Sequence, residues 1–191
     1  MNNKLENTYE LCDNCIKVSN VFTDFSGWEH RFSHQELPAF YTVSYLNDFI
    51  WYDGDKPWTN DKLSSRNDLK FWGDPVYAED CRFYIKENNT ETWCAWVSSE
   101  SGYGIGLYVP NVDSYYAGRN DYNGSKSSSD GATNYVAPLN TLKIVSYEPI
   151  EYAYLITTGS VSEMRNTFKG SKDFSDNASL HKNYQSMRVK D

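Results

Sequence analysis

Short runs of β-branched and aromatic residues recur along this chain, and turn-forming residues separate them. Val, Ile, Thr, Tyr, Phe and Trp pack well on a pleated sheet, whereas Gly, Pro, Asn and Asp favour turns. The runs expected to form strands are residues 15–22, 39–52, 81–85, 92–97, 104–109, 142–147 and 151–157, and residues 46–48 could interrupt the second run. Strands at this spacing predict a mostly β chain folded as an antiparallel β-sandwich.

Helix is expected only near the C-terminus. Ser160 and Glu163 have the spacing of a capping box, which would open a short helix that Gly170 could close. Residues 171–191 are polar with scattered apolar positions, so they could form a weak second helix or a linker. We therefore expect one β-sandwich domain over residues 1–170, with one or two short helices near its end. The tail over 171–191 would lead to a further domain of a longer protein.

Aromatic residues supply much of the surface that this chain can bury. The 191 residues include 16 Tyr, nine Phe and six Trp, which is enough for a substantial core. The formal net charge is −8, and no two Lys or Arg residues are adjacent. Nucleic-acid binding needs clustered positive charge, so we expect no nucleic-acid partner. No apolar run approaches the length of a membrane span, so we also expect no membrane segment.

The four cysteines leave two interpretations open. Cys12 and Cys15 form a C-x-x-C, but the βαβ pattern of a thioredoxin-like motif does not surround them. Cys81 and Cys94 are too far apart to complete a zinc ribbon. They flank a predicted hairpin with its turn near residues 87–90, where they could form a cross-strand disulfide or stay as free buried thiols.

Residues 35–58 combine aromatic rings with short acidic side chains in the sequence QELPAFYTVSYLNDFIWYDGDKPW. Rings can stack on the C–H faces of a sugar while carboxylates accept hydrogen bonds from its hydroxyls. The candidate catalytic carboxylates are Glu36 and an Asp from the following stretch, Asp53 being our choice. Glu36 precedes an apolar run, so we expect it to be partly desolvated with a raised pKa. Turn chemistry is the alternative interpretation for the Asp residues.

Candidate substrate-binding residues extend beyond the two carboxylates. Gln35, Tyr41 and Tyr116 would offer polar contacts and ring faces, and Trp58, in a turn-rich segment after a proline, would be an exposed stacking platform. Arg119 could pair with a substrate carboxylate such as a uronate, although a solvated loop arginine is the alternative. Residues 118–133 form a polar loop that is either functional or mobile. Trp93 and Trp96 lie on a strand and are expected in the core.

The sequence predicts no metal site and no cofactor. Glu29, His30 and His34 lack the H-E-x-x-H order of a zinc site, so a solvated loop is favoured. The glycines of residues 102–106 are followed by a strand and Pro110, whereas dinucleotide binding needs a helix at that point. Glycines inside a strand more often permit a bulge or a close backbone approach.

Several motifs resemble a segment found in large secreted bacterial proteins of carbohydrate metabolism. They are QELPAFY, YDGDKPWT, WCAWVSSESGYGIGLYVP, NYVAP and LITTGSVSEMR. The resemblance implies a large antiparallel sandwich like those of galactose-mutarotase-like domains, which occur in glycoside hydrolases and polysaccharide lyases. It supplies no catalytic residues.

Two functions follow as expectations. The first is a carbohydrate-binding or carbohydrate-processing domain with a glycan or polysaccharide as its partner. The second is a non-catalytic structural or adhesive module of a surface protein. The Asn- and Asp-rich composition favours an extracellular or cell-surface location. No apolar signal-peptide region is visible, so we expect the chain to be a piece of a longer secreted polypeptide.

Overall fold

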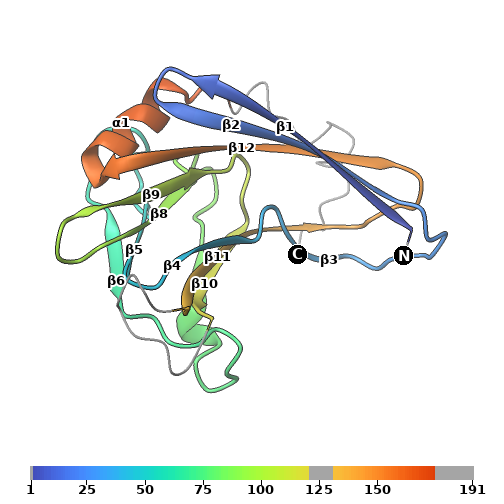
Figure 1. Ribbon diagram of the computed structural model, residues 1–191, viewed down its shortest axis with the longest axis horizontal. Helices are drawn as coiled ribbons and strands as arrows, with labels where there is room; N and C mark the ends of the chain where they lie inside the picture. The colour runs from blue at the N-terminus through green and yellow to red at the C-terminus, as the bar shows by residue number, and fades with distance from the viewer. Residues whose placement is uncertain (1, 121–130, 175–191) are drawn as a thin grey trace.

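The computed structural model of the chain describes residues 2–120 and 131–174. The larger of its two sheets has seven strands in the order β1-β2-β12-β9-β8-β5-β6 (Figure 1). Their bounds are β1 Asn3–Cys12, β2 Cys15–Asp24, β5 Asp48–Trp51, β6 Ser64–Asn67, β8 Trp93–Val97, β9 Tyr103–Tyr108 and β12 Pro149–Ser160. Each of these neighbouring strands pairs antiparallel with the next.

The smaller sheet has five strands, and β11 lies at its centre. The bounds are β3 Ser33–Glu36, β4 Phe40–Val43, β7 Arg82–Tyr84, β10 Ser114–Arg119 and β11 Thr133–Leu142. β10 pairs with one edge of β11, and β4 and β3 pair one after the other with the opposite edge. The cis peptide bond between Leu37 and Pro38 lies in the short connection from β3 to β4. Gln35, Glu36 and Tyr41 therefore lie along one edge of β11.

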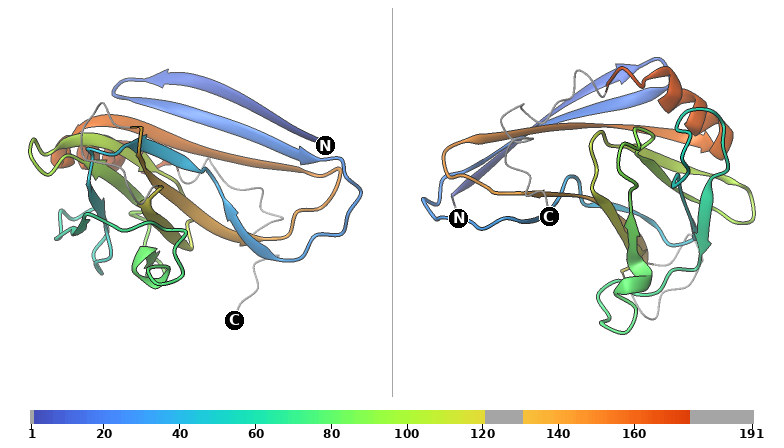
Figure 2. Two further views of the ribbon diagram at one scale, coloured as in Figure 1. Left: turned by 60° about the horizontal axis from the view of Figure 1, so that its bottom comes forward. Right: turned by 180° about the vertical axis from the view of Figure 1, so that it is seen from behind.

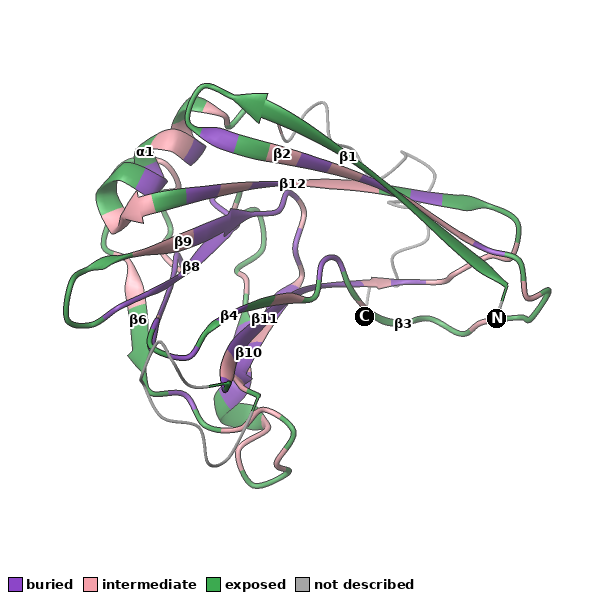
Figure 3. Ribbon diagram, in the orientation of Figure 1, coloured by how far each residue is buried: buried purple, intermediate pink, exposed green. Residues whose placement is uncertain are grey.

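Aromatic side chains fill the space between the two sheets. Phe49 and Trp51 of β5 face Phe83 of β7, with ring centroids 4.9 and 4.7 Å apart respectively. Trp96 of β8 and Tyr115 of β10 belong to the same buried cluster. Buried positions concentrate where the two sheets face each other (Figure 3). This arrangement confirms the predicted antiparallel β-sandwich, and it confirms that the tryptophans of β8 are core residues.

Helix α1, Val161–Gly170, covers the other face of the seven-stranded sheet. Its predicted capping box is present: the Ser160 hydroxyl accepts a hydrogen bond from the Glu163 amide, and the Glu163 carboxylate accepts one from the Ser160 amide. Met164 and Phe168 pack on the sheet beside Gly106, where a Cβ atom would lie 2.9 Å from the Phe168 ring. Gly106 thus makes room for side chains of the helix. The expected close backbone approach is at Gly104, where a Cβ atom would collide with the Trp96 carbonyl oxygen. Residues 171–174 follow the helix, and the tail over 175–191 lies outside the described residues.

A predicted hairpin and a predicted strand are wrong. Residues 81–85 and 92–97 do not form a hairpin, because β7 belongs to the five-stranded sheet and β8 to the seven-stranded sheet. Cys81 and Cys94 consequently carry free, buried thiols. Residues 142–147 begin at the end of β11 and continue as a connection to β12, which lies in the other sheet. Neighbouring strands in the sequence here cross between layers instead of pairing.

The β1–β2 hairpin was not predicted as a whole, since only its second strand has a buried face. Figure 2 shows the hairpin lying alongside β12 at the outer edge of the sheet. All ten residues of β1 are exposed (Figure 3). Six of the ten residues of β1 are Asn, Lys, Glu or Cys, and Asn, Glu and Lys are depleted in strands, so its composition did not mark it as one.

Candidate functional site

A groove of about 920 Å³ opens where β4, β9, β12 and the start of α1 meet. Three tyrosines line it with much of their side chains in solvent: Tyr103 is 58% exposed, Tyr41 48% and Tyr45 39%. The hydroxyl-bearing residues Thr42, Thr133 and Thr158 also line the groove. Tyr41 was named from the sequence. Thr42 and Tyr45 lie in the same aromatic and acidic stretch, whereas Tyr103, Thr133 and Thr158 come from distant segments that only the topology brings beside it.

Glu163 supplies the carboxylate of this groove. Its Oε2 accepts hydrogen bonds from the Ser160 amide at 2.8 Å and the Ser160 hydroxyl at 2.7 Å. These bonds hold the pKa of Glu163 below its ordinary value. Gly159, with φ of 148°, lies beside the carboxylate, and a Cβ atom there would be 3.1 Å from Oε2. The capping box therefore fixes an ionised carboxylate at the groove.

Tyr41 also belongs to a row of rings on the outer face of the five-stranded sheet. Its ring centroid lies 4.9 Å from that of Tyr135, which stacks on Trp72 at 5.1 Å. Trp72 in turn meets Tyr116 edge-on at 5.9 Å and accepts a hydrogen bond from the Tyr116 hydroxyl at its carbonyl. Tyr115 faces the core, so its neighbour Tyr116 faces outward. The structure thus joins two predicted residues, Tyr41 and Tyr116, through rings that were not predicted.

Glu36 and Gln35 lie at the end of β3 beside this row. Burial raises the pKa of Tyr135 above its ordinary value, and the nearby Glu36 carboxylate adds to the rise. The Tyr135 hydroxyl nevertheless has no hydrogen bond of ordinary geometry within the described part of the chain. Glu36 is exposed, so the expected desolvation of this carboxylate is wrong. Gln35 is half-buried and donates a hydrogen bond to the Ser33 hydroxyl at 2.7 Å.

Arg119 is the last residue of β10. Its amide donates to the Lys70 carbonyl at 2.8 Å, and its carbonyl accepts from the Trp72 amide at 3.1 Å. These bonds hold the segment that carries Trp72 against the sheet. The predicted polar loop over 118–133 falls mostly on residues 121–130, which lie outside the described residues.

Asp53 and Trp58 lie elsewhere, in the connection from β5 to β6. Asp53 accepts a hydrogen bond from the Ser64 hydroxyl at 2.7 Å. The Trp58 indole donates to the Thr90 hydroxyl at 3.1 Å and meets the Tyr108 ring edge-on at 5.7 Å. The Trp58 side chain is therefore a half-buried packing element, not the freely exposed platform that the sequence predicts.

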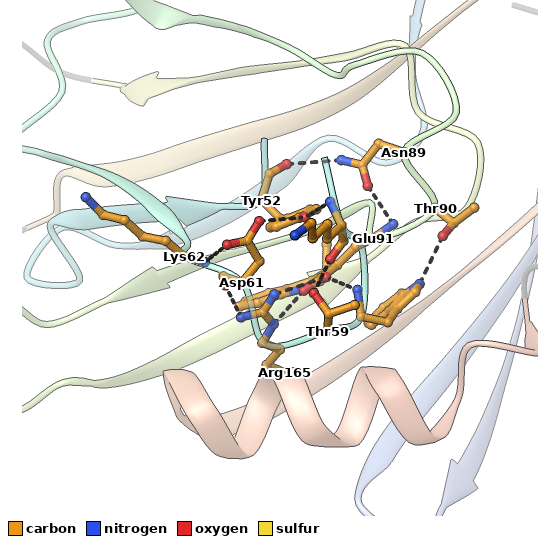
Figure 4. A network of polar contacts seen from close by, with 11 residues as sticks. Tyr52, Thr59, Asp61, Lys62, Asn89, Thr90, Glu91 and Arg165 are labelled. Atoms are coloured by element: carbon orange, nitrogen blue, oxygen red, sulfur yellow. Dashed lines mark hydrogen bonds and ion pairs between the residues drawn. The ribbon is translucent and has the colours of Figure 1, made fainter. Parts of the chain in front are cut away.

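A buried polar network surrounds Glu91, which is 0% exposed (Figure 4). Its carboxylate accepts hydrogen bonds from the Arg165 side chain, the Trp93 indole and the Trp58 amide. Arg165 also donates to the Asp61 carbonyl at 2.6 Å. Glu91 is saturated with donors and sealed from solvent, so the network is structural.

Sequence reasoning missed both charged residues of this network. Glu91 stands in a polar run and looks like a surface residue. Arg165 gives a usable signal, because in the helix it shares a face with Val161 and Phe168. A charge on an apolar helix face indicates a buried partner.

A second hollow of about 810 Å³ lies between the β1–β2 turn and α1. Cys12, Cys15 and Asn166 line it, and Glu163 borders both hollows. Over residues 2–120 and 131–174, no group of three or more His, Cys, Asp or Glu side chains could hold a metal ion. None of the helices in this part of the chain is long and apolar enough to cross a membrane.

Comparison with known proteins finds no family model that matches the chain and no curated protein with a matching sequence.

Proposed function

We propose that this chain is a carbohydrate-binding β-sandwich and that its glycan lies in the groove lined by Tyr41, Tyr45 and Tyr103. The observation that carries the proposal is the set of three partly exposed tyrosine rings around one hollow of about 920 Å³. Scattered exposed rings are ordinary on protein surfaces, but several rings that line one concave site favour ligand binding.

The groove has the two kinds of group that sugar recognition needs. Tyrosine rings offer apolar faces to the C–H groups of a pyranose, and their hydroxyls can hydrogen-bond to its edges. The Glu163 carboxylate, whose hydrogen bonds with Ser160 hold its pKa below the ordinary value, can accept hydrogen bonds from sugar hydroxyls. Thr133 and Thr158 add neutral donors and acceptors.

The ring row gives the proposed site an extension. Tyr41 lines the groove and contacts Tyr135, and Glu36 lies beside the Tyr135 hydroxyl. A glycan longer than the groove could continue toward Glu36 and Gln35 at the end of β3.

Glycan binding is the part of the sequence prediction that the geometry supports best. Cleavage by the pair Glu36 and Asp53 stays a prediction, because Glu36 ends a strand of the five-stranded sheet whereas Asp53 lies in the connection between two strands of the seven-stranded sheet.

Affinity electrophoresis through gels that contain soluble polysaccharides tests the proposal. We expect at least one polysaccharide to retard the protein, and Tyr103→Ala to remove most of that retardation. Tyr84→Ala is the matched control, since Tyr84 is also exposed but lies on β7, away from the groove. If no glycan retards the protein, or if both variants bind like the parent, the proposal is wrong. The structural or adhesive function would then be favoured.

A further inference from the structure

The outermost strand of the seven-stranded sheet, β1, presents a long edge suited to pairing. It runs for ten residues in continuous register with β2, from Asn3 opposite Asp24 to Cys12 opposite Cys15. It contains no proline, and its register has no bulge. Proteins usually interrupt or cover such an edge, because its free backbone groups can pair with another strand.

The hydrogen-bonding groups on this edge belong to the odd-numbered residues. The Phe25 amide donates to the Asn2 carbonyl, which extends the same register by one pair. In an antiparallel ladder, hydrogen-bonded pairs alternate, so the even-numbered residues of β1 point their backbone groups toward β2. The amides and carbonyls of Leu5, Asn7 and Tyr9 therefore point toward the edge of β1 with which no strand of the described residues pairs.

Apolar side chains accompany these free backbone groups. Leu5 is 55% exposed, Tyr9 68% and Leu11 88%. The opposite face carries the charged residues Lys4, Glu6 and Glu10. β1 therefore has an apolar face and a charged face along a single open edge.

We propose that β1 pairs antiparallel with β1 of a second copy of this chain, in a register centred on Asn7. This register aligns odd-numbered residues with odd-numbered residues, as the free backbone groups require. It places Leu5 opposite Tyr9 of the second copy, and the two-fold symmetry repeats this apolar pair. It also places Lys4 opposite Glu10 of the second copy, which gives two ion pairs of opposite charge.

Charge selects this register over its neighbours. A register centred on Thr8 would place Glu6 opposite Glu10, and one centred on Glu6 would place two Glu6 residues opposite each other. Like charges that face each other across strands are unfavourable. Because one strand carries both halves of the complementary charge pattern, a second copy is the partner that it fits best.

Complementary charge variants test the pairing without depending on the glycan proposal. Lys4→Glu places two acidic pairs in the interface, and Glu10→Lys places two basic pairs there. An equimolar mixture of the two variants restores opposite charges at both positions. Sedimentation velocity should show that the parent forms a dimer as its concentration rises from about 1 to 200 µM, since weak complexes have dissociation constants in this range. Each variant alone should have a dissociation constant raised by about tenfold or more, and the mixture should recover dimers.

The mixture also controls for folding, because a misfolded variant could not complement the other. A parent chain that is monomeric throughout this range overturns the proposal, and so does a mixture that dimerises no better than its components. Dimers that form only after residues 175–191 are deleted would also overturn it, since the chain's own tail would then occupy the edge.

Discussion

Arg165 and Glu91 form a buried ion pair that ties helix α1 to the segment ahead of β8, with Arg165 Nε 2.6 Å from Glu91 Oε1. Arg165 also lies over the Tyr52 ring at 5.4 Å from its centroid, and the Glu91 carboxylate holds the Trp58 amide. One pair of charges therefore fixes the helix, the β5–β6 connection and the start of β8. Because Glu163 lies on the same helix, this pair also positions the groove.

Replacing Arg165 by Met should destabilise the protein strongly. The Glu91 carboxylate would stay buried without its cation. Removing one partner of a buried ion pair leaves the other charge unpaired and lowers the unfolding free energy by about 3–5 kcal/mol. Urea unfolding followed by tryptophan fluorescence measures the change. Lys86→Met breaks the exposed pair with Asp55 and should change stability little. Equal effects of the two substitutions would contradict a structural role for the buried pair.

Gly106 should tolerate no side chain under helix α1. A Cβ atom there would lie 2.9 Å from the Phe168 ring and 3.0 Å from the Met164 sulfur, so Gly106→Ala forces the helix outward. We expect a loss of about 1–3 kcal/mol in unfolding free energy, as in overpacked cores. Gly131→Ala is the matched control, because a Cβ atom on Gly131 would have no atom of the described residues within 4 Å. A neutral Gly106 variant would show that α1 is loosely packed.

The Asp24 carboxylate should make stability depend on acid pH. It accepts hydrogen bonds from the side chains of Ser146 and Ser26 and from the Ser26 amide, and these hold its pKa well below the ordinary value. The Asp24 carboxylate therefore binds a proton less readily in the folded protein than in the unfolded chain. Its contribution to stability is present above the unfolded pKa of about 3.9 and is lost as the pH falls further.

Thermal unfolding of the parent and of Asp24→Asn between about pH 7 and pH 3 measures this contribution. The variant should be less stable than the parent at neutral pH, and the difference between their unfolding temperatures should become smaller in acid. A difference of constant size would count against the hydrogen-bonded carboxylate as its cause.

Cys12 should be the one thiol of the native protein that reacts quickly with a disulfide reagent. It is exposed, whereas Cys15, Cys81 and Cys94 are buried. Burial raises the pKa of Cys15 and of Cys81 to about 11 and that of Cys94 further, so these thiols hold little thiolate near neutral pH. The reduced protein should give one fast equivalent at about pH 8 and all four in denaturant. Fast labelling that persists in Cys12→Ser would contradict this assignment.

The sequence could predict the fold class because strand composition and turn residues are local properties. The residues of β2, β8 and β9 and the capping box of α1 were found in this way. Strand pairing was not predictable, because consecutive strands such as β7 and β8 cross between sheets. β1 was missed since nothing covers its side chains in the described structure.

The candidate groove could be predicted only in part. Tyr41 belonged to a conspicuous aromatic and acidic stretch, whereas Tyr103 and Glu163 come from distant segments that meet through the pairing of β9 with β12. Trp58 looked exposed in sequence because it follows a proline in a turn-rich segment. The structure instead places it against Tyr108 and the Glu91 network.

Stacking of a sugar on Tyr103 is the central claim, and calorimetric titration with an oligosaccharide of the best retarding polysaccharide tests it most directly. Tyr103→Phe keeps the ring and should bind within a few-fold of the parent, whereas Tyr103→Ala should lose about tenfold in affinity, the equivalent of one ring contact. Equal affinity of the parent and Tyr103→Ala would contradict the claim.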